Sequence, residues 1–328
     1  MTKKPLFSVA PVALLLCLSL PLYAGGGRES PPAGREGQLN IVATTGMIGD
    51  VVRNVAGDLA TVHTLMGEDI DPHLFRPTRA DVARMQAADI IFYNGLLLEG
   101  RMGDSLVQIG RTKPVFAVSE RVDESLLLDD EEYEEAFDPH LWMDVSLWMK
   151  AVDVVADALA EIDPRNAGSF RANATAYRAE LETLDAYVRR IAATVPAERR
   201  VLITAHDAFG YFGNAYGFEV RGVQGMSTES EAGLDDVNSL VSFVVERGIS
   251  AVFAETTVPD RALSAVIEGA AARQHRVEIG GELFSDAMGA PGTYEGTYIG
   301  MIDHNATTIV RALGGSAPER GLHGRLGQ

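Results

Sequence analysis

Short apolar runs alternate with amphipathic stretches through residues 39–119. The runs LNIVATT and LATVHTLM have the length and β-branched content of buried strands, and GMIGDVVRNVAG between them has helical spacing. The alternation continues through RADVARMQAADIIFYNG and GDSLVQIGRTKPVFAVS. Strands that alternate with helices in this way predict a parallel sheet covered by helices on both faces.

The same pattern returns in residues 197–316. RRVLITAHDAFGYFGNAYGFEVRGV reads as strand, helix and strand, and two helix–strand units and a closing helix follow it. The predicted fold class is therefore α/β, with two lobes that each hold a central, mainly parallel sheet flanked by helices. Ligands of open parallel sheets bind beyond the carboxyl ends of the strands, so two facing lobes predict a binding cleft between them.

A helical stretch separates the two blocks. Residues 144–163 have apolar positions at helical spacing and end before Pro164, and residues 165–195 have no Gly or Pro beyond their first turn. At 1.5 Å per residue the second helix would span about 45 Å, which is enough to cross a whole domain. It predicts a long, rigid helix packed along both lobes, with an apolar stripe of Phe170, Tyr177, Leu181, Leu184, Tyr187 and Ile191.

The amino terminus has the composition of a secretory signal peptide. Lys3 and Lys4 precede an apolar run that ends near Ala24, after which cleavage is expected. An uncleaved leader acting as an anchor is one alternative, and lipidation of Cys17, the only cysteine, is another. After cleavage no thiolate would remain, so any metal ion would need nitrogen and oxygen ligands.

These patterns divide the chain into six predicted parts. They are a signal peptide (1–24), a flexible tether (25–38), an N-terminal lobe (39–163), a linking helix (164–196), a C-terminal lobe (197–316) and a tail (317–328).

The net charge restricts the class of partner. A formal charge of −18 and a pI near 4.8 argue against nucleic acid, because a polyphosphate would be repelled, whereas a cation would be attracted. The acidic stretch 129–135 would help to concentrate cations; the alternative is a solvated loop with no binding role.

Three of the seven histidines occupy positions typical of binding residues. His73 and His140 each lie in a DPHL sequence, where the proline stiffens the turn and a nearby aspartate or carbonyl can accept the proton of the other ring nitrogen. His206 directly follows an apolar strand, at the expected edge of the cleft. For the other four, a structural or solvent-exposed role is expected: His63, His275, His304 and His323.

Two acidic residues complete the candidate set. Asp286 follows the last strand of the second block, with a helix cap or turn as its alternative role, and Glu255 ends the strand AVFAE. Three neutral imidazoles and one carboxylate suit a first-row divalent cation, so His73, His140, His206 and Asp286 are predicted to bind one, with Glu255 supporting a ligand. The sequence has no HExxH, GxSxG, Walker or Rossmann motif.

Four ordered motifs resemble a known family. DPHLFRPTRAD, DPHLWMDV, HDAFGYFGNAYG and the pair LFSDAMG and GTYIGMIDHN are similar to segments of the metal-binding solute-binding proteins of ABC importers. These form the zinc and manganese branch, the cluster A-I family (TroA-, ZnuA- and PsaA-like), and the resemblance is nearest to the TroA type. It implies two α/β lobes on a rigid linking helix, agreeing with the pattern above.

The resemblance also implies a function and a ligand set. The family's ligands correspond to His73 and His140 in the first lobe and to His206 and Asp286 in the second. Zn²⁺ or Mn²⁺ would be the transported ligand rather than a catalytic cofactor, and the partner would be a membrane permease with its ATPase. The protein would be a periplasmic or surface-held monomer.

The sequence leaves the metal open between zinc and manganese. The third ligand is His206, where some manganese proteins of the family have glutamate, but the acidic segment before His140 lacks the histidines common in zinc specialists. A secreted metalloenzyme with Glu255 as its base and a surface adhesin with a structural metal are the alternatives. A closed set of four ligands favours binding over catalysis.

Overall fold

The structure is a computed structural model that describes residues 1–2, 38–130 and 136–327. The predicted signal peptide, Cys17, nearly all of the tether and residues 131–135 of the acidic stretch lie outside the described residues. Everything below concerns the compact unit that begins at Gly34. None of its described helices is both long enough and apolar enough to cross a membrane.

The first half contains a four-stranded parallel sheet in the order β2-β1-β3-β4. Central strand β1 is buried because its apolar side chains are covered on both faces. The strands of this sheet are β1 (Leu39–Ala43), β2 (Ala60–Thr64), β3 (Ile90–Tyr93) and β4 (Val115–Ala117). The helices between them are α1 (Gly46–Ala56), α2 (Arg79–Ala87) and α3 (Gly103–Gly110).

The second half repeats the alternation with two parallel strand pairs, β5–β6 and β7–β8, and β5 lies against β7. Its elements are β5 (Val201–His206), α6 (Gly210–Tyr216), β6 (Glu219–Gln224), α7 (Leu234–Arg247), β7 (Ala251–Glu255), α8 (Arg261–Ala272), β8 (Glu278–Leu283) and α9 (Tyr298–Ala312). Within the described residues, every pair of hydrogen-bonded strands named here is parallel, as predicted for this fold class.

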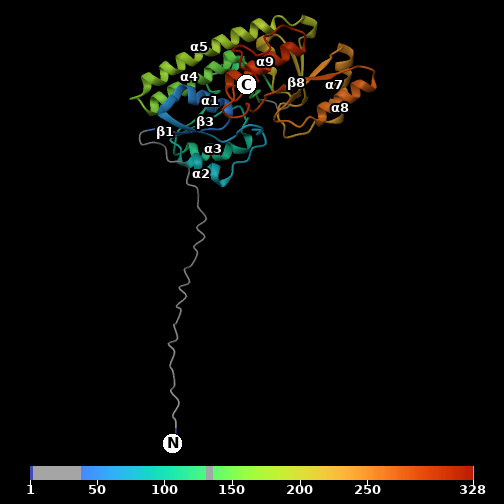
Figure 1. Cartoon of the computed structure of the whole chain (residues 1–328). Helices are drawn as coiled ribbons and strands as arrows, with labels where there is room; N and C mark the ends of the chain where they lie inside the picture. Colours follow the sequence, from blue (N-terminus) through green and yellow to red (C-terminus); the bar gives the residue numbers. More distant parts are fainter. Residues whose placement is uncertain (3–37, 131–135, 328) are drawn as a thin grey trace. The chain divides into compact units, whose positions relative to one another are not determined.

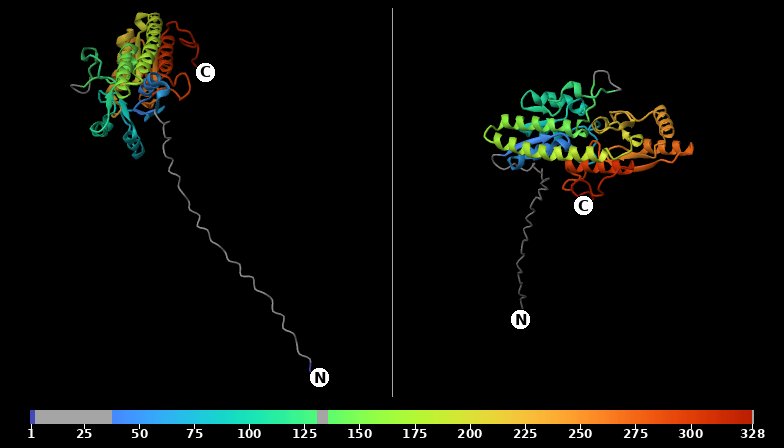
Figure 2. Two further views of the ribbon diagram at one scale, coloured as in Figure 1. Left: turned by 90° about the vertical axis from the view of Figure 1, so that its left-hand side faces the viewer. Right: turned by 90° about the horizontal axis from the view of Figure 1, so that it is seen from above.

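Two long helices connect the halves. Helix α4 (Val145–Ile162) and helix α5 (Ala167–Ala192) lie side by side along one side of the molecule (Figure 2). Helix α5 has 26 residues and therefore spans about 39 Å. Helix α4 ends at Ile162 because Pro164 disfavours helical geometry in the residue before it, Asp163. Helix α5 contacts α1 of the first half and α9 of the second.

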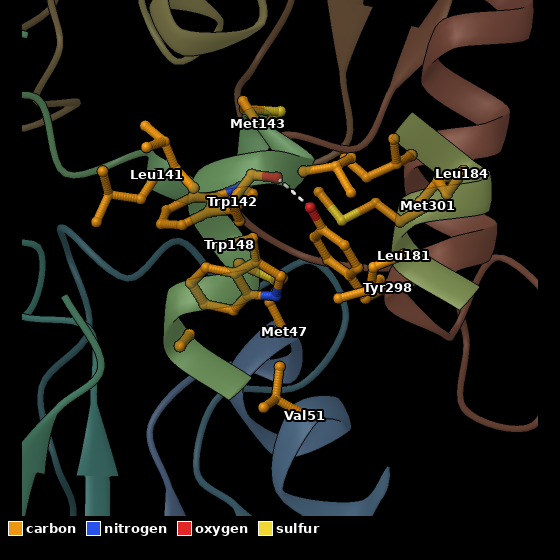
Figure 3. Packing of buried hydrophobic residues seen from close by; sticks show 14 of the residues in the cluster. Met47, Val51, Leu141, Trp142, Met143, Trp148, Leu181, Leu184, Tyr298 and Met301 are labelled. Atoms are coloured by element: carbon orange, nitrogen blue, oxygen red, sulfur yellow. Dashed lines mark hydrogen bonds between the residues drawn. The ribbon is translucent and has the colours of Figure 1, made fainter. Parts of the chain in front are cut away.

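One hydrophobic core includes residues of both halves. Figure 3 shows Trp142 and Trp148 on one side of Tyr298 of α9, and Leu181 and Leu184 of α5 on its other side. The Tyr298 hydroxyl donates to the Trp142 carbonyl at 2.7 Å, and the Trp148 and Tyr298 ring centroids are 5.7 Å apart. Since this core is continuous from α1 to α9, large relative movement of the halves would expose it to water.

The substitution Leu184→Ala should lower the free energy of unfolding by about 2–5 kcal/mol, because Leu184 is fully buried and its removal leaves a cavity between the halves. Chemical denaturation checks this. Glu182→Ala is the control on the exposed face of the same helix and should change stability by no more than about 0.5 kcal/mol. Equal losses from both substitutions would contradict this packing.

Candidate metal centre

The first DPHL turn places His73 in the loop between β2 and α2. The Asp71 side chain accepts a hydrogen bond from the His73 backbone N–H at 2.8 Å, which closes the turn. The other oxygen of Asp71 accepts the Thr228 hydroxyl at 2.5 Å. Thr228 follows β6 in the second half, so this hydrogen bond connects the His73 turn to the opposite half of the molecule.

The second DPHL turn holds His140 more tightly. One oxygen of Asp138 accepts both the His140 backbone N–H, at 2.8 Å, and the ring Nδ1–H, at 2.7 Å. The Asn94 amide, directly after β3, donates to the Pro139 carbonyl at 2.9 Å. The contact with Asp138 fixes the tautomer of the ring and leaves Nε2 as the atom that can bind an ion.

His206 and Asp286 come from the carboxyl ends of strands in the second half, as predicted. His206 is the last residue of β5, and Glu255, the last residue of β7, accepts its backbone N–H at 2.8 Å and its Nδ1–H at 2.5 Å. Asp286 lies three residues after β8. Trp142 of the first half donates its indole N–H to the carbonyl of the preceding Ser285 at 2.8 Å.

The structure brings His73, His140, His206 and Asp286 together, with one ligand atom of each within 4.8 Å of the others. The Nε2 atoms of His73 and His140 are 3.3 Å apart, and Asp286 oxygens lie 3.4 Å from His140 Nε2 and 3.3 Å from His206 Nε2. His73 Nε2 lies 3.8 Å from Asp286. Four atoms that bind Zn²⁺ tetrahedrally at about 2.1 Å would be about 3.4 Å apart, close to these separations.

Burial makes this cluster unfavourable without a cation. His140 and His206 are fully buried, and Asp286 is 2% and His73 7% exposed. His206 Nε2 and both Asp286 oxygens have no hydrogen-bond partner within the described residues. Buried polar atoms are rarely left unpaired, because each loses its bonds to water. A divalent ion at the centre would satisfy all of them, so the residues fit such a ligand.

The surroundings shift the pKa values of the four groups in different directions. Burial lowers the pKa of His73 to about 3. Burial also opposes a charge on His140, but Asp138 and Asp286 outweigh it and raise its pKa to about 9. Glu255 and Asp286 likewise outweigh burial and raise the pKa of His206. Burial opposes a charge on Asp286 too, but the His206 and His140 rings outweigh it and hold the pKa of Asp286 well below its usual range. At pH 7 both nitrogens of the His140 ring and of the His206 ring are therefore protonated when no metal is bound.

A cavity of about 410 Å³ reaches the cluster from the side of His73. Its lining includes Leu97 and Arg101 of the first half and Met226 and Glu229 of the second. His73 is the most exposed of the four ligands, so the approach from solvent passes beside it. The larger cavity of about 820 Å³ is lined by none of the four.

The other four histidines lie outside the cluster. Of the other histidines, two donate to carbonyls: His275 to Ile249 at 2.6 Å and His304 to Glu282 at 3.0 Å. The four are placed as follows: His63 in β2, His275 before β8, His304 in α9 and His323 in the C-terminal segment. Sequence reasoning missed Asn94 and Thr228; the only signal for Asn94 was a polar residue directly after a buried strand.

Comparisons with a family model and with known proteins agree on one family. Residues 41–312 match the family described as zinc-uptake complex component A, periplasmic (ZnuA). The chain is 48% identical over 284 residues to the zinc-binding protein TroA of Treponema pallidum, covering 87% of this chain and 92% of the relative. It is 45% identical over 289 residues to the manganese-binding lipoprotein MntA of Bacillus subtilis, covering 88% and 94%.

A solved structure supports the fold. The periplasmic zinc binding protein TroA from Treponema pallidum matches with a TM-score of 0.82 at 48% identity, over 84% of this chain and 99% of that one. The predicted α/β fold is confirmed. The chain belongs to the ZnuA family of periplasmic metal-uptake components.

Proposed function

We propose that this protein is the substrate-binding component of an ABC importer, which captures Zn²⁺ or Mn²⁺ outside the cytoplasm and delivers it to a membrane permease. The observation that carries the proposal is the meeting of His73, His140, His206 and Asp286 in one buried cluster drawn from both halves. Relatives named as zinc-binding and as manganese-binding support the choice of cargo.

The ligand set binds the ion as cargo rather than as a catalyst. Four protein ligands close a tetrahedral shell, whereas catalytic zinc sites keep a position for water. Glu255 is not free to act as a general base, since both of its oxygens accept hydrogen bonds from His206. The protein is a transport binding protein rather than an enzyme, in line with the description of its family.

The nitrogen-rich ligand set determines the relative affinity of the site for Zn²⁺ and Mn²⁺. Imidazole nitrogen suits Zn²⁺, and zinc binds most such sites more tightly than manganese. With three neutral rings, one carboxylate and a divalent ion, the site has a net charge of about +1. We infer that Zn²⁺ binds more tightly and that Mn²⁺ is also accepted, so metal availability decides which ion is carried.

The division into lobes explains capture. In this proposal lobes 39–163 and 197–316 each supply two ligands, and the linking helix 164–196 keeps them at a nearly fixed distance. An ion favours the closed arrangement only through its higher affinity for that arrangement. The continuous core limits the change to small tilts and to movement of the His73 turn, the most exposed part of the site.

The partner and location follow from the same proposal. A relative named as the substrate-binding lipoprotein of a metal ABC transporter supports a permease with its ATPase as the partner. The leader at residues 1–24 would direct the chain to the periplasm or to the outer face of the membrane. We expect a monomer with no affinity for nucleic acid, given its charge of −18.

Replacing a ligand should abolish tight binding. We expect His73→Ala, His140→Ala, His206→Ala and Asp286→Ala each to weaken Zn²⁺ binding by a factor of about 100 or more, with the metal-free fold retained. Calorimetric titration of chelator-treated protein measures this. His304→Ala is the control, because the His304 ring donates to the Glu282 carbonyl and lies outside the metal cluster. Equal losses from all five substitutions would mean that the site is assigned wrongly.

Glu255→Gln should weaken Zn²⁺ binding by about 10–100-fold without removing a ligand, since Gln holds the His206 ring less firmly and makes it less basic. Competition with a chromogenic chelator gives the dissociation constant. Glu282→Gln replaces an exposed glutamate in the neighbouring strand and should leave the constant unchanged. Unchanged affinity in Glu255→Gln would show that this hydrogen bond does not support the ligand.

Metal binding should release protons. The pKa of His140 is raised to about 9 and that of His206 is raised as well, so both rings are doubly protonated at pH 7 in the metal-free protein, and an ion must displace one proton from each. Affinity should therefore fall with decreasing pH below 9, by up to about 100-fold per unit. Calorimetry in buffers of different ionisation enthalpy should find about two protons released per ion at pH 7. A constant affinity between pH 6 and pH 8 would contradict this.

A further inference from the structure

The segment Ser316–Gly327, here called the C-terminal strap, follows the region that matches the family, which ends at residue 312. It does not leave the surface of the molecule. Ser316 N–H donates to the Thr194 hydroxyl at 2.7 Å, and the Leu322 side chain packs against the main hydrophobic core. The end of the chain is drawn beside α9 in Figure 1.

The strap is anchored on a buried carboxylate of α9. Asp303 is fully buried, and both of its oxygens accept the Leu322 backbone N–H, at 3.0 and 2.8 Å. Gly321 adopts a φ of 71°, and a Cβ there would lie 2.4 Å from an Asp303 oxygen, so only glycine allows this approach. The Tyr294 hydroxyl donates to Asp303 at 3.0 Å.

Tyr294 belongs to the loop that carries the aspartate ligand. This segment, Asp286–Gly296, is here called the Asp286 loop, and it is closed by a backbone hydrogen bond from Gly289 N–H to the Glu295 carbonyl at 2.9 Å. The strap contacts its closing end twice more. The Arg325 guanidinium lies 4.6 Å from the centre of the Tyr294 ring, and Gly327 N–H donates to the Glu295 carboxylate at 2.9 Å.

Asp286 depends on its backbone more than His140 and His206 do. Asp138 fixes the ring of His140 and Glu255 fixes that of His206, but outside the ligand set no described side chain donates to the Asp286 carboxylate. Its position is therefore set by how firmly the chain is held on either side of it.

Helix α9 holds both sides of this loop. Before Asp286, the Asn305 amide group accepts from the Phe284 N–H at 2.9 Å and donates to the Phe284 carbonyl at 2.7 Å. After Asp286, Tyr294 is fastened to Asp303, and the strap covers this second attachment. We propose that the C-terminal strap is a positioning element of the metal site, which fixes Asp286 by clamping its loop onto α9.

The positioning role of the strap rests on the proposed function. A double-mutant cycle tests this role separately from metal binding itself. A chain that ends at Gly315 lacks the strap and should bind Zn²⁺ about tenfold more weakly than the full chain, as for other losses of support to a ligand. In the Asp286→Ala background the truncation should cause no further loss. In the His73→Ala background the tenfold loss should persist.

Two variants guard against general destabilisation. Tyr294→Phe keeps the strap and removes only the hydroxyl that joins the loop to Asp303, so it should weaken binding several-fold, again only when Asp286 is present. Arg320→Ala changes an exposed residue of the strap and should leave the dissociation constant unchanged. If the truncated chain does not fold, the cycle built on Tyr294→Phe decides.

Several outcomes would overturn the proposal. Unchanged affinity in a folded truncated chain and in Tyr294→Phe would show that the strap does not position the ligand. An equal loss in the Asp286→Ala background would show that it acts only on general stability. If the full chain bound no Zn²⁺ at all, the proposed function itself would fail, and this inference would fail with it.

Discussion

Burial of four ligand atoms in one small volume is the constraint on which the rest of the structure depends. Three imidazoles and a carboxylate each place one ligand atom within 4.8 Å of the others, with almost no access to water. Without a cation they must share protons or stay unpaired, and both states are costly in an apolar interior. Tight metal binding follows from the relief of this cost.

The cluster is held together by residues in contact with the ligands and by packing further away. Asp138 and Glu255 orient two of the rings, and Trp142 reaches from the first half to the carbonyl beside Asp286. Further away, a continuous core from α1 to α9 holds the halves together. In the proposed function, small movements near His73, the most exposed of the four ligands, control access to the buried site.

The sequence allowed the candidate ligands to be located because topology determines where they lie. His206, Glu255 and Asp286 come at or just after the ends of parallel strands, and such ends converge on one edge whatever the details of packing. The repeated DPHL indicated two stiff turns of similar chemistry. The sequence could not show that the two turns differ. Asp138 contacts the ring of His140, whereas Asp71 contacts only the backbone N–H of His73 and also accepts the Thr228 hydroxyl.

The features that the sequence did not reveal depend on contacts between distant segments. A glycine-rich C-terminal segment predicts a tail by composition, and only the fold places Gly321 and Leu322 against buried Asp303. Asn94 reads as an ordinary polar residue at a strand end until the Pro139 carbonyl is found beside it. The hydrogen-bonded partners Leu322 and Asp303 lie 19 residues apart, and Asn94 and Pro139 lie 45 apart, beyond the reach of any local pattern.

The central claim is that one divalent ion binds among the four residues. Crystals of the zinc-loaded full chain, measured at the zinc absorption edge, test it most directly. We expect one anomalous peak per chain at about 2.0–2.2 Å from Nε2 of His73, His140 and His206 and from an oxygen of Asp286. A peak at any other position, or no peak in fully loaded protein, would contradict the account.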